Sequence, residues 1–87
     1  MKKFSVERQN RRERICKLIL SIVRQSNGIW VSELGRELER SGVRLSWFGV
    51  KYYIFGQNVS EKVYGGWLKD KIEIANKEGR NVMLKIK

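Results

Sequence analysis

Four arginines near the N-terminus are the side chains whose chemistry is simplest to state. Arg8, Arg11, Arg12 and Arg14 precede the first apolar stretch of the chain. A guanidinium group is planar, permanently charged and suited to bidentate pairing with phosphate. The cluster could neutralise backbone phosphates, insert arginine into a narrow minor groove, or become ordered on RNA. A solvated basic tail without a partner would have the same sequence.

Four more cations stand at positions from which they could reach a nucleic acid. Arg44 lies in a predicted turn and Lys51 on the helix that follows, so both could meet phosphate or guanine. Lys77 and Arg80 flank the tip of a predicted hairpin. The alternative for each of these residues is an ordinary solvated charge.

Aromatic rings accompany these cations on the predicted helix that Ser46 caps. Trp47, Phe48 and Tyr52 are expected to be exposed on its N-terminal half together with Lys51. Rings contact thymine methyls and sugars, and they discriminate poorly between bases. They could instead dock a partner protein or a second subunit. For Phe48, and for Phe55 further along, a place in the core of the domain is the alternative.

The chain lacks the residues that catalytic and metal-binding sites commonly need. The chain has no histidine and a single cysteine, Cys16, which excludes His-dependent catalysis, a cysteine-rich zinc site and an internal disulfide. No carboxylate pair is evident, and Gly65-Gly66 lacks the lysine and hydroxyl residue of a phosphate-binding loop. We expect no enzymatic activity, no cofactor and no small-molecule substrate. Cys16 is expected to be a small semi-buried apolar side chain, with a disulfide across a dimer as the alternative.

Composition points to a polyanionic partner. Nineteen basic residues stand against nine acidic ones, for a net charge of +10 over 87 residues. Nucleic acid is the first candidate and an anionic membrane surface the second. Residues 1–17 carry seven basic and two acidic side chains, and residues 67–87 carry six and three, so positive charge collects at the two ends of the chain. No apolar run approaches the roughly 20 residues of a membrane span, and no secretory signal is evident. We therefore expect a cytoplasmic protein, associated with the nucleoid in a prokaryote or with host cytoplasm if viral.

Helical periodicity dominates the first part of the chain. Apolar residues between positions 6 and 25 recur at helical spacing: Ile15, Leu18, Ile19, Ile22 and Val23. A short strand is predicted at 29–31, followed by a helix with Ser32 as N-cap. In this second helix Leu34 and Leu38 face the core, and Gly35 is interpreted as a close crossing with the third helix. In the third helix Val50 and Ile54 face inward, with Tyr53 beside them.

The period changes to two in the last part of the chain. Residues 56–66 could extend the third helix or form a separate turn. Leu68, Ile72 and Ile74 are then predicted to lie on one face of a strand. A loop at 76–80 follows, and a returning strand points Val82, Leu84 and Ile86 inward, with Met83, Lys85 and Lys87 outward.

This order of elements resembles the winged helix-turn-helix family. The matching residues are Val31-Ser32-Glu33-Leu34 opening the second helix, Ser46, Val50 and Ile54 in the third, and the strands 68–74 and 82–86 as the wing. The narrower likeness is to small basic winged-helix proteins of archaea and their viruses. The resemblance implies binding of duplex DNA, transcription regulation and often a homodimer. Trp47, Phe48 and Tyr52 depart from the family's usual polar recognition residues.

We therefore predict an α+β fold of the winged helix-turn-helix type, with three helices and a C-terminal β-hairpin wing. Residues 1–13 would form a basic arm or helix extension, and residues 14–87 the domain. The predicted function is binding of double-stranded DNA by the third helix in the major groove, with the arm and wing on the backbone. The alternatives are a protein-interaction module that uses the aromatic face, and RNA binding.

Overall fold

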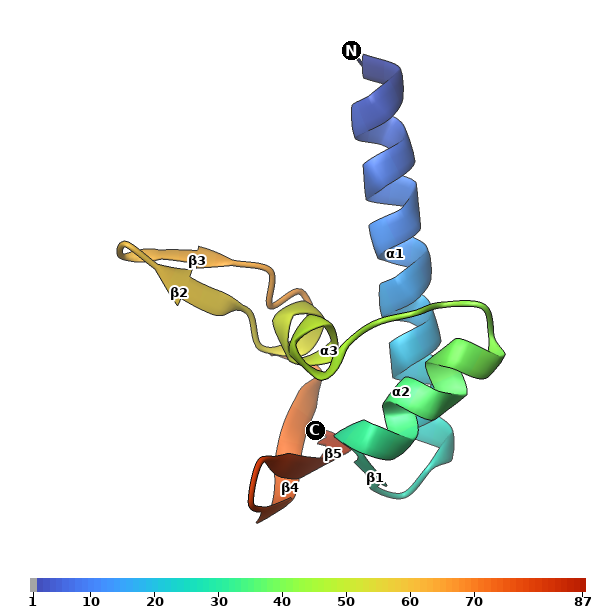
Figure 1. Ribbon diagram of the computed structural model, residues 1–87, viewed down its shortest axis with the longest axis vertical. Coiled ribbons are helices and arrows are strands. Elements are labelled where there is room, and N and C mark those ends of the chain that lie inside the picture. The colour runs from blue at the N-terminus through green and yellow to red at the C-terminus, as the bar shows by residue number, and fades with distance from the viewer. Residues whose placement is uncertain (1) are drawn as a thin grey trace.

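A single long helix forms the N-terminal part of the protein. The computed structural model describes the backbone of residues 2–87 and the side chains of residues 8–87; position 1 of the predicted 1–13 segment lies outside the described residues. Helix α1 spans Lys2–Gln25. Ile15, Ile19 and Val23, spaced four apart, are buried along its C-terminal half. The N-terminal half extends beyond the rest of the molecule (Figure 1), so the basic segment from Lys2 onward continues the helix.

Two short helices follow α1. Strand β1 is Ile29–Trp30, α2 is Val31–Arg40 and α3 is Trp47–Ile54. The predicted cap of α3 is confirmed, because the backbone N–H of Gly49 donates to the Ser46 hydroxyl over 3.1 Å. The predicted cap of α2 is wrong.

Helix α2 begins one residue before Ser32, and its N-terminal end is capped by a residue from elsewhere in the chain. Trp30 occupies the N-cap position and makes no side-chain cap bond. Instead the Ser32 N–H donates to the side-chain oxygen of Asn81 over 3.4 Å, and the Asn81 amide donates to the Ser32 hydroxyl over 3.1 Å. A residue of the C-terminal hairpin therefore closes the start of α2.

The crossing predicted at Gly35 is also wrong. A Cβ built on Gly35 would have no neighbour within 4 Å. Leu34 and Leu38 are fully buried, as predicted, and they alone carry the packing of this part of α2.

A three-stranded antiparallel sheet in the order β1-β5-β4 forms one wall of the core. Strand β4 is Ile72–Glu78 and β5 is Asn81–Ile86, joined by the two-residue turn Gly79-Arg80. The first predicted strand was placed too early, because residues 67–71 form turns, from which Leu68 still reaches the core. The register of β4 shifts between Ile74 and Asn76. Ile74 is 49% exposed at this sheet edge, which contradicts its predicted inward place.

The returning strand β5 largely follows its prediction. Val82 and Leu84 are buried, and Ile86 packs partly against the core. Met83, predicted to point outward, is half-buried, and its sulfur lies 3.1 Å from the position that a Cβ on Gly28 would take.

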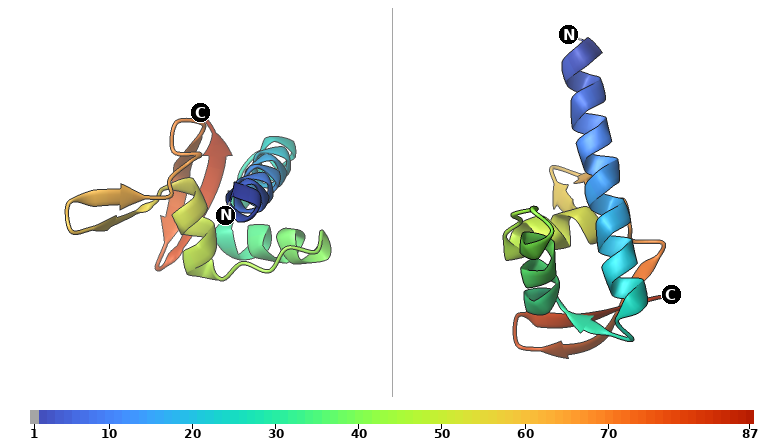
Figure 2. Two further views of the ribbon diagram at one scale, coloured as in Figure 1. Left: turned by 90° about the horizontal axis from the view of Figure 1, so that it is seen from above. Right: turned by 90° about the vertical axis from the view of Figure 1, so that its right-hand side faces the viewer.

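Residues 56–66, left open between helix and turn, form a second hairpin. Strands β2 (Gln57–Val59) and β3 (Lys62–Tyr64) pair with each other and with no other described strand. Their turn residues Ser60 and Glu61 have φ angles of 50° and 68°, as a type I′ turn requires. The hairpin projects sideways from the end of α3 (Figures 1 and 2).

The base of this hairpin is closed by glycines. A Cβ on Gly65 would lie 2.5 Å from the Tyr52 carbonyl oxygen, and one on Gly56 would lie 2.8 Å from the Tyr64 carbonyl oxygen. The N–H of Gly66 donates to the Tyr52 carbonyl over 2.8 Å. The chain therefore leaves and re-enters the body of the domain at nearly the same place.

All three helices and the β1-β5-β4 sheet share one apolar core. The fold is α+β, with three helices and two small antiparallel sheets among the described residues. The fully buried side chains are Ile19, Val23, Val31, Leu34, Leu38, Val50, Ile54, Ile72 and Leu84.

Candidate nucleic-acid interface

Helix α3 and the β4–β5 turn meet through one lysine. The Lys51 ammonium donates to the Arg80 carbonyl oxygen over 3.1 Å and lies 5.1 Å from the centre of the Trp47 ring. The structure thus brings together three residues predicted to act at one site. It also directs Lys51 toward the hairpin, because one of its three donors is already engaged there.

The aromatic face of α3 is smaller than predicted. Trp47 and Phe55 are partly buried against the core. Tyr52 is half buried and makes an edge contact with Trp67, with ring centres 5.6 Å apart. Phe48 alone stands out, with 79% of its surface exposed. Of the two alternatives for Phe48, the structure supports exposure and not a place in the core.

The remaining predicted residues of α3 and the β4–β5 hairpin are solvent-accessible. Arg44 lies 3.8 Å from the Glu39 carboxylate in an exposed pair, which stabilises little and is easily exchanged for another anion. Ser46 is exposed although its oxygen caps α3. Lys77 lies within β4, three residues before Arg80 in the turn, and both are exposed.

The arginines of α1 divide between two environments. Arg11 and Arg14 are exposed. Arg12 is half buried, and its guanidinium carbon lies 4.9 Å from the centre of the Trp67 ring. Arg12 therefore points toward the body of the domain, whereas the other two point into solvent.

Trp67 belongs to an aromatic cluster that sequence reasoning missed. The cluster consists of Tyr52, Tyr53 and Trp67, with the Tyr53 and Trp67 ring centres 5.1 Å apart. Tyr53 was predicted to lie beside the inward residues of α3, and no role was predicted for Trp67. A possible signal was the Gly65-Gly66 pair, which lets the chain turn back onto α3 directly before a tryptophan.

A cavity of about 390 Å³ lies where α1 passes this cluster. We call it the α1 cavity, and its lining residues are Arg8, Gln9, Arg12, Tyr53 and Trp67. Arg8 and Arg12 belong to the predicted basic cluster, whereas no role was predicted for Gln9. Their spacing with Arg12, at i, i+1 and i+4, places the three on one side of the helix.

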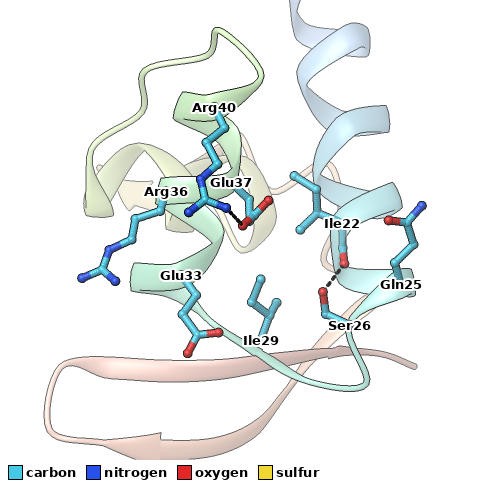
Figure 3. Close-up of a pocket in the computed structure, with 8 residues that line it drawn as sticks. All are labelled: Ile22, Gln25, Ser26, Ile29, Glu33, Arg36, Glu37 and Arg40. Carbon is cyan, nitrogen blue, oxygen red and sulfur yellow. Dashed lines mark hydrogen bonds and ion pairs between the residues drawn. The ribbon is translucent and has the colours of Figure 1, made fainter.

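A second cavity, of about 430 Å³, separates the end of α1 from α2 (Figure 3). Its two acidic side chains, Glu33 and Glu37, equal its two arginines, Arg36 and Arg40, in number, and Arg40 pairs with Glu37 at 3.0 Å. Arg36 points away from the others in Figure 3. This balance of charge gives the second cavity no preference for an anion.

The predicted cationic regions lie along the long axis of the molecule. The free end of α1 and the β4–β5 hairpin occupy opposite ends, with α3 between them (Figures 1 and 2). The two charged ends of the sequence therefore lie on either side of α3 along this axis. A ligand that contacts all three elements must extend along the same direction.

Cys16 is half buried on α1 and forms no disulfide. Burial raises the pKa of its thiol above the usual value, and nearby Arg12 opposes this rise. Within residues that the structure describes, no group of three metal-binding side chains occurs. The described helices likewise include none with the length and apolar character needed to cross a membrane.

Comparison of the chain with known protein families, with curated proteins and with solved structures found no match.

Proposed function

We propose that the protein binds double-stranded DNA as a winged helix-turn-helix domain, with α3 entering the major groove and the β4–β5 hairpin acting as the wing. The contact of Lys51 with the Arg80 carbonyl is the observation that carries this proposal. It fixes the hairpin turn beside α3, so that a duplex seated on the helix also meets the turn. The net charge of +10 supplies affinity for phosphate.

The outward surface of α3 favours binding with little sequence preference. Phe48 offers apolar contact, and the exposed hydroxyl of Ser46 already caps the helix. Base discrimination needs hydrogen bonds to base edges, for which Lys51 is the main donor left on this surface. Regulation of transcription and a homodimer complete the proposal, because the family resemblance implies both.

Salt dependence tests the role of α1. Each phosphate contact contributes a slope of about −0.9 to the dependence of log affinity on log salt. Replacing both Arg11 and Arg14 with Ala should therefore flatten the slope by about 1.8 and weaken all duplexes alike. The matched control replaces Lys17 and Arg24, exposed cations on the C-terminal half of the same helix. Equal flattening in both double variants would show diffuse attraction and no phosphate clamp.

Phe48 and Lys51 test the role of α3. Phe48→Ala should weaken duplex binding without unfolding, because its ring is mostly exposed. Lys51→Ala should cost about 1–3 kcal/mol if the lysine pairs with guanine, with circular dichroism to confirm the fold. Binding of each variant to duplex RNA of matching length is measured for comparison with its binding to duplex DNA. If both variants bind duplex DNA as the parent does, α3 is not the binding face.

A protein-docking function is the second candidate, and the β2–β3 hairpin favours it. Two-stranded hairpins are marginal in isolation, yet this one exposes Val59, Val63 and Tyr64. Phe48, on the helix that leads into the hairpin, is also exposed. On this candidate Phe48→Ala dissolves an oligomer and leaves DNA affinity unchanged, which sedimentation and binding on the same samples would reveal.

A further inference from the structure

The α1 cavity combines an aromatic wall with a cationic one. One wall is aromatic, made of Tyr53 and Trp67, and the other is the side of α1 that carries Arg8, Gln9 and Arg12. None of these five side chains is acidic. An anion that also has a flat apolar part would match both walls.

The aromatic wall remains accessible although Arg12 lies over it. Trp67 is 40% exposed, and Tyr53 is half-buried against the core. The Arg12 guanidinium carbon lies 4.9 Å from the centre of the tryptophan ring. A guanidinium group carries five N–H donors, and a contact with a ring face does not use them as hydrogen bonds, so they can serve a phosphate.

The helical wall offers both charge and a base-edge partner. Arg8 is exposed at the mouth of the cavity, one turn of helix before Arg12. The Gln9 amide donates to the Glu13 carboxylate over 3.5 Å in an exposed contact, a length at the outer limit for a hydrogen bond. The amide is therefore readily redirected to a ligand.

Volume and chemistry together select the ligand. The cavity of about 390 Å³ is large enough for one base with its sugar and phosphate. Bases in a duplex are stacked on their neighbours and present only their edges to a protein, so a ring face can be reached only in an unpaired nucleotide.

We infer that the α1 cavity binds one unpaired nucleotide of a single-stranded nucleic acid, with the base stacked on Trp67 and Tyr53 and the phosphate held by Arg8 and Arg12. This site is separate from the proposed duplex-binding face of α3. It would bind a frayed end, a flipped base or a single strand, and it operates whether or not α3 enters a major groove.

The test uses the full chain with 5-fluorotryptophan at its three tryptophans, each assigned by a Trp→Phe variant. The probe is a thymidylate octamer, a length of roughly eight nucleotides that lies within the range of known single-strand sites. The comparison ligands are an abasic octamer of equal charge, a uridylate octamer and free thymidine monophosphate. The expected result is a fluorine shift at Trp67 with the thymidylate octamer and little shift with the abasic one. Affinity for the abasic octamer should be lower by roughly tenfold, which corresponds to the loss of one stacked base.

Two double variants separate the site from general charge attraction. Arg8→Gln with Arg12→Gln removes both cavity cations, whereas Arg11→Gln with Arg14→Gln removes the same charge from exposed positions of the same helix. The cavity pair should lose roughly tenfold more affinity for the thymidylate octamer than the control pair. Equal losses, equal affinity for the abasic octamer, or an unmoved Trp67 resonance would each overturn the inference. The uridylate octamer and the free nucleotide show whether the site takes RNA or needs a polymer.

Discussion

At the scale of single residues, Gly35 lies inside α2 without a structural reason to be glycine. No atom would lie within 4 Å of its Cβ. Glycine costs about 1 kcal/mol relative to alanine inside a helix, because the unfolded chain loses more freedom on folding. Gly35→Ala should therefore raise the free energy of unfolding by about 0.5–1 kcal/mol, measured by urea denaturation.

Gly65→Ala is the matched control at a glycine that the fold requires. Its φ angle is 73°, and the added carbon would lie 2.5 Å from a backbone oxygen. We expect a loss of at least about 1–3 kcal/mol, the cost of a strained backbone position. If Gly35→Ala instead destabilises the protein about as much as Gly65→Ala does, the result will support the predicted close helix crossing at Gly35.

Cys16 offers a test of burial by pH. Its thiol pKa is raised chiefly by desolvation, while Arg12 lowers it. The folded protein therefore holds the proton to higher pH than the unfolded chain does, and the resulting contribution to stability disappears as pH rises through the folded pKa. Alkylation by iodoacetamide should start at higher pH in the native protein than in urea.

Arg12→Gln should move this alkylation profile to still higher pH, because it removes the largest opposing charge. Arg14→Gln, an exposed neighbour, is the control and should leave the profile in place. Coincident profiles for native and unfolded protein would contradict the burial of Cys16.

At the scale of elements, the sequence predicted correctly those features that residues close together in the chain determine. The four-residue spacing of Ile15, Ile19 and Val23 fixes the buried side of α1, and Ser46 lies within three residues of the N–H that it caps. The cap of α2 could not be predicted in the same way. Its partner Asn81 is 49 positions away, and Ser32 has the composition of an N-cap although the helix begins before it.

The β2–β3 hairpin escaped prediction for a related reason. Hairpin turns with two positive φ angles normally contain Asn-Gly or Asp-Gly, whereas this turn is Ser60-Glu61. Its strands are three residues long, too short for an alternating pattern to be distinguished from a helical one. Tertiary contacts at the glycine base supply what the turn sequence lacks.

Asn81→Ala tests the long-range cap of α2. The substitution removes the acceptor for the Ser32 N–H and the donor to its hydroxyl. Loss of a helix cap costs about 0.5–2 kcal/mol, and we expect a decrease in the free energy of unfolding in this range. The control Asn76→Ala removes an exposed amide whose oxygen accepts only from the adjacent Lys77 N–H. If both variants change the free energy of unfolding equally, the contact between Asn81 and α2 does not stabilise the fold as a helix cap.

At the scale of the whole molecule, three segments project from one small core. The free half of α1, the β2–β3 hairpin and the tip of the β4–β5 hairpin extend in different directions (Figures 1 and 2). The sequence predicted the first and third as carriers of charge. It could not predict the α1 cavity, because Arg8 and Trp67 are far apart in the chain and line one cavity only in the folded domain.

Removing the β2–β3 hairpin separates the two proposed functions. Deletion of residues 57–64 joins Gly56 to Gly65, which the closed base of the hairpin already holds near each other. The core loses no fully buried side chain, so we expect the variant to fold and to bind duplex DNA with an unchanged salt slope. If the hairpin instead docks a second copy, sedimentation will show that an oligomer becomes a monomer.

An internal control for the deletion is the substitution of Ser60-Glu61 by Asn-Gly. It suits the φ angles of the turn and should stabilise the hairpin without altering its strands. If the protein is still an oligomer after the deletion, or if the deletion lowers its affinity for duplex DNA, the docking role of this hairpin is contradicted.

The meeting of Gly56 with Gly65 and Gly66 also bears on how this protein can change over generations. Because the chain departs and returns at one point, the peptide between those glycines can gain, lose or exchange residues without shifting the register of the elements on either side. Selection can then act on the hairpin and on the core independently. The same property makes positions 57–64 a suitable place to graft a foreign epitope or a reporter peptide, provided that its two ends lie as close together as the strands that it replaces.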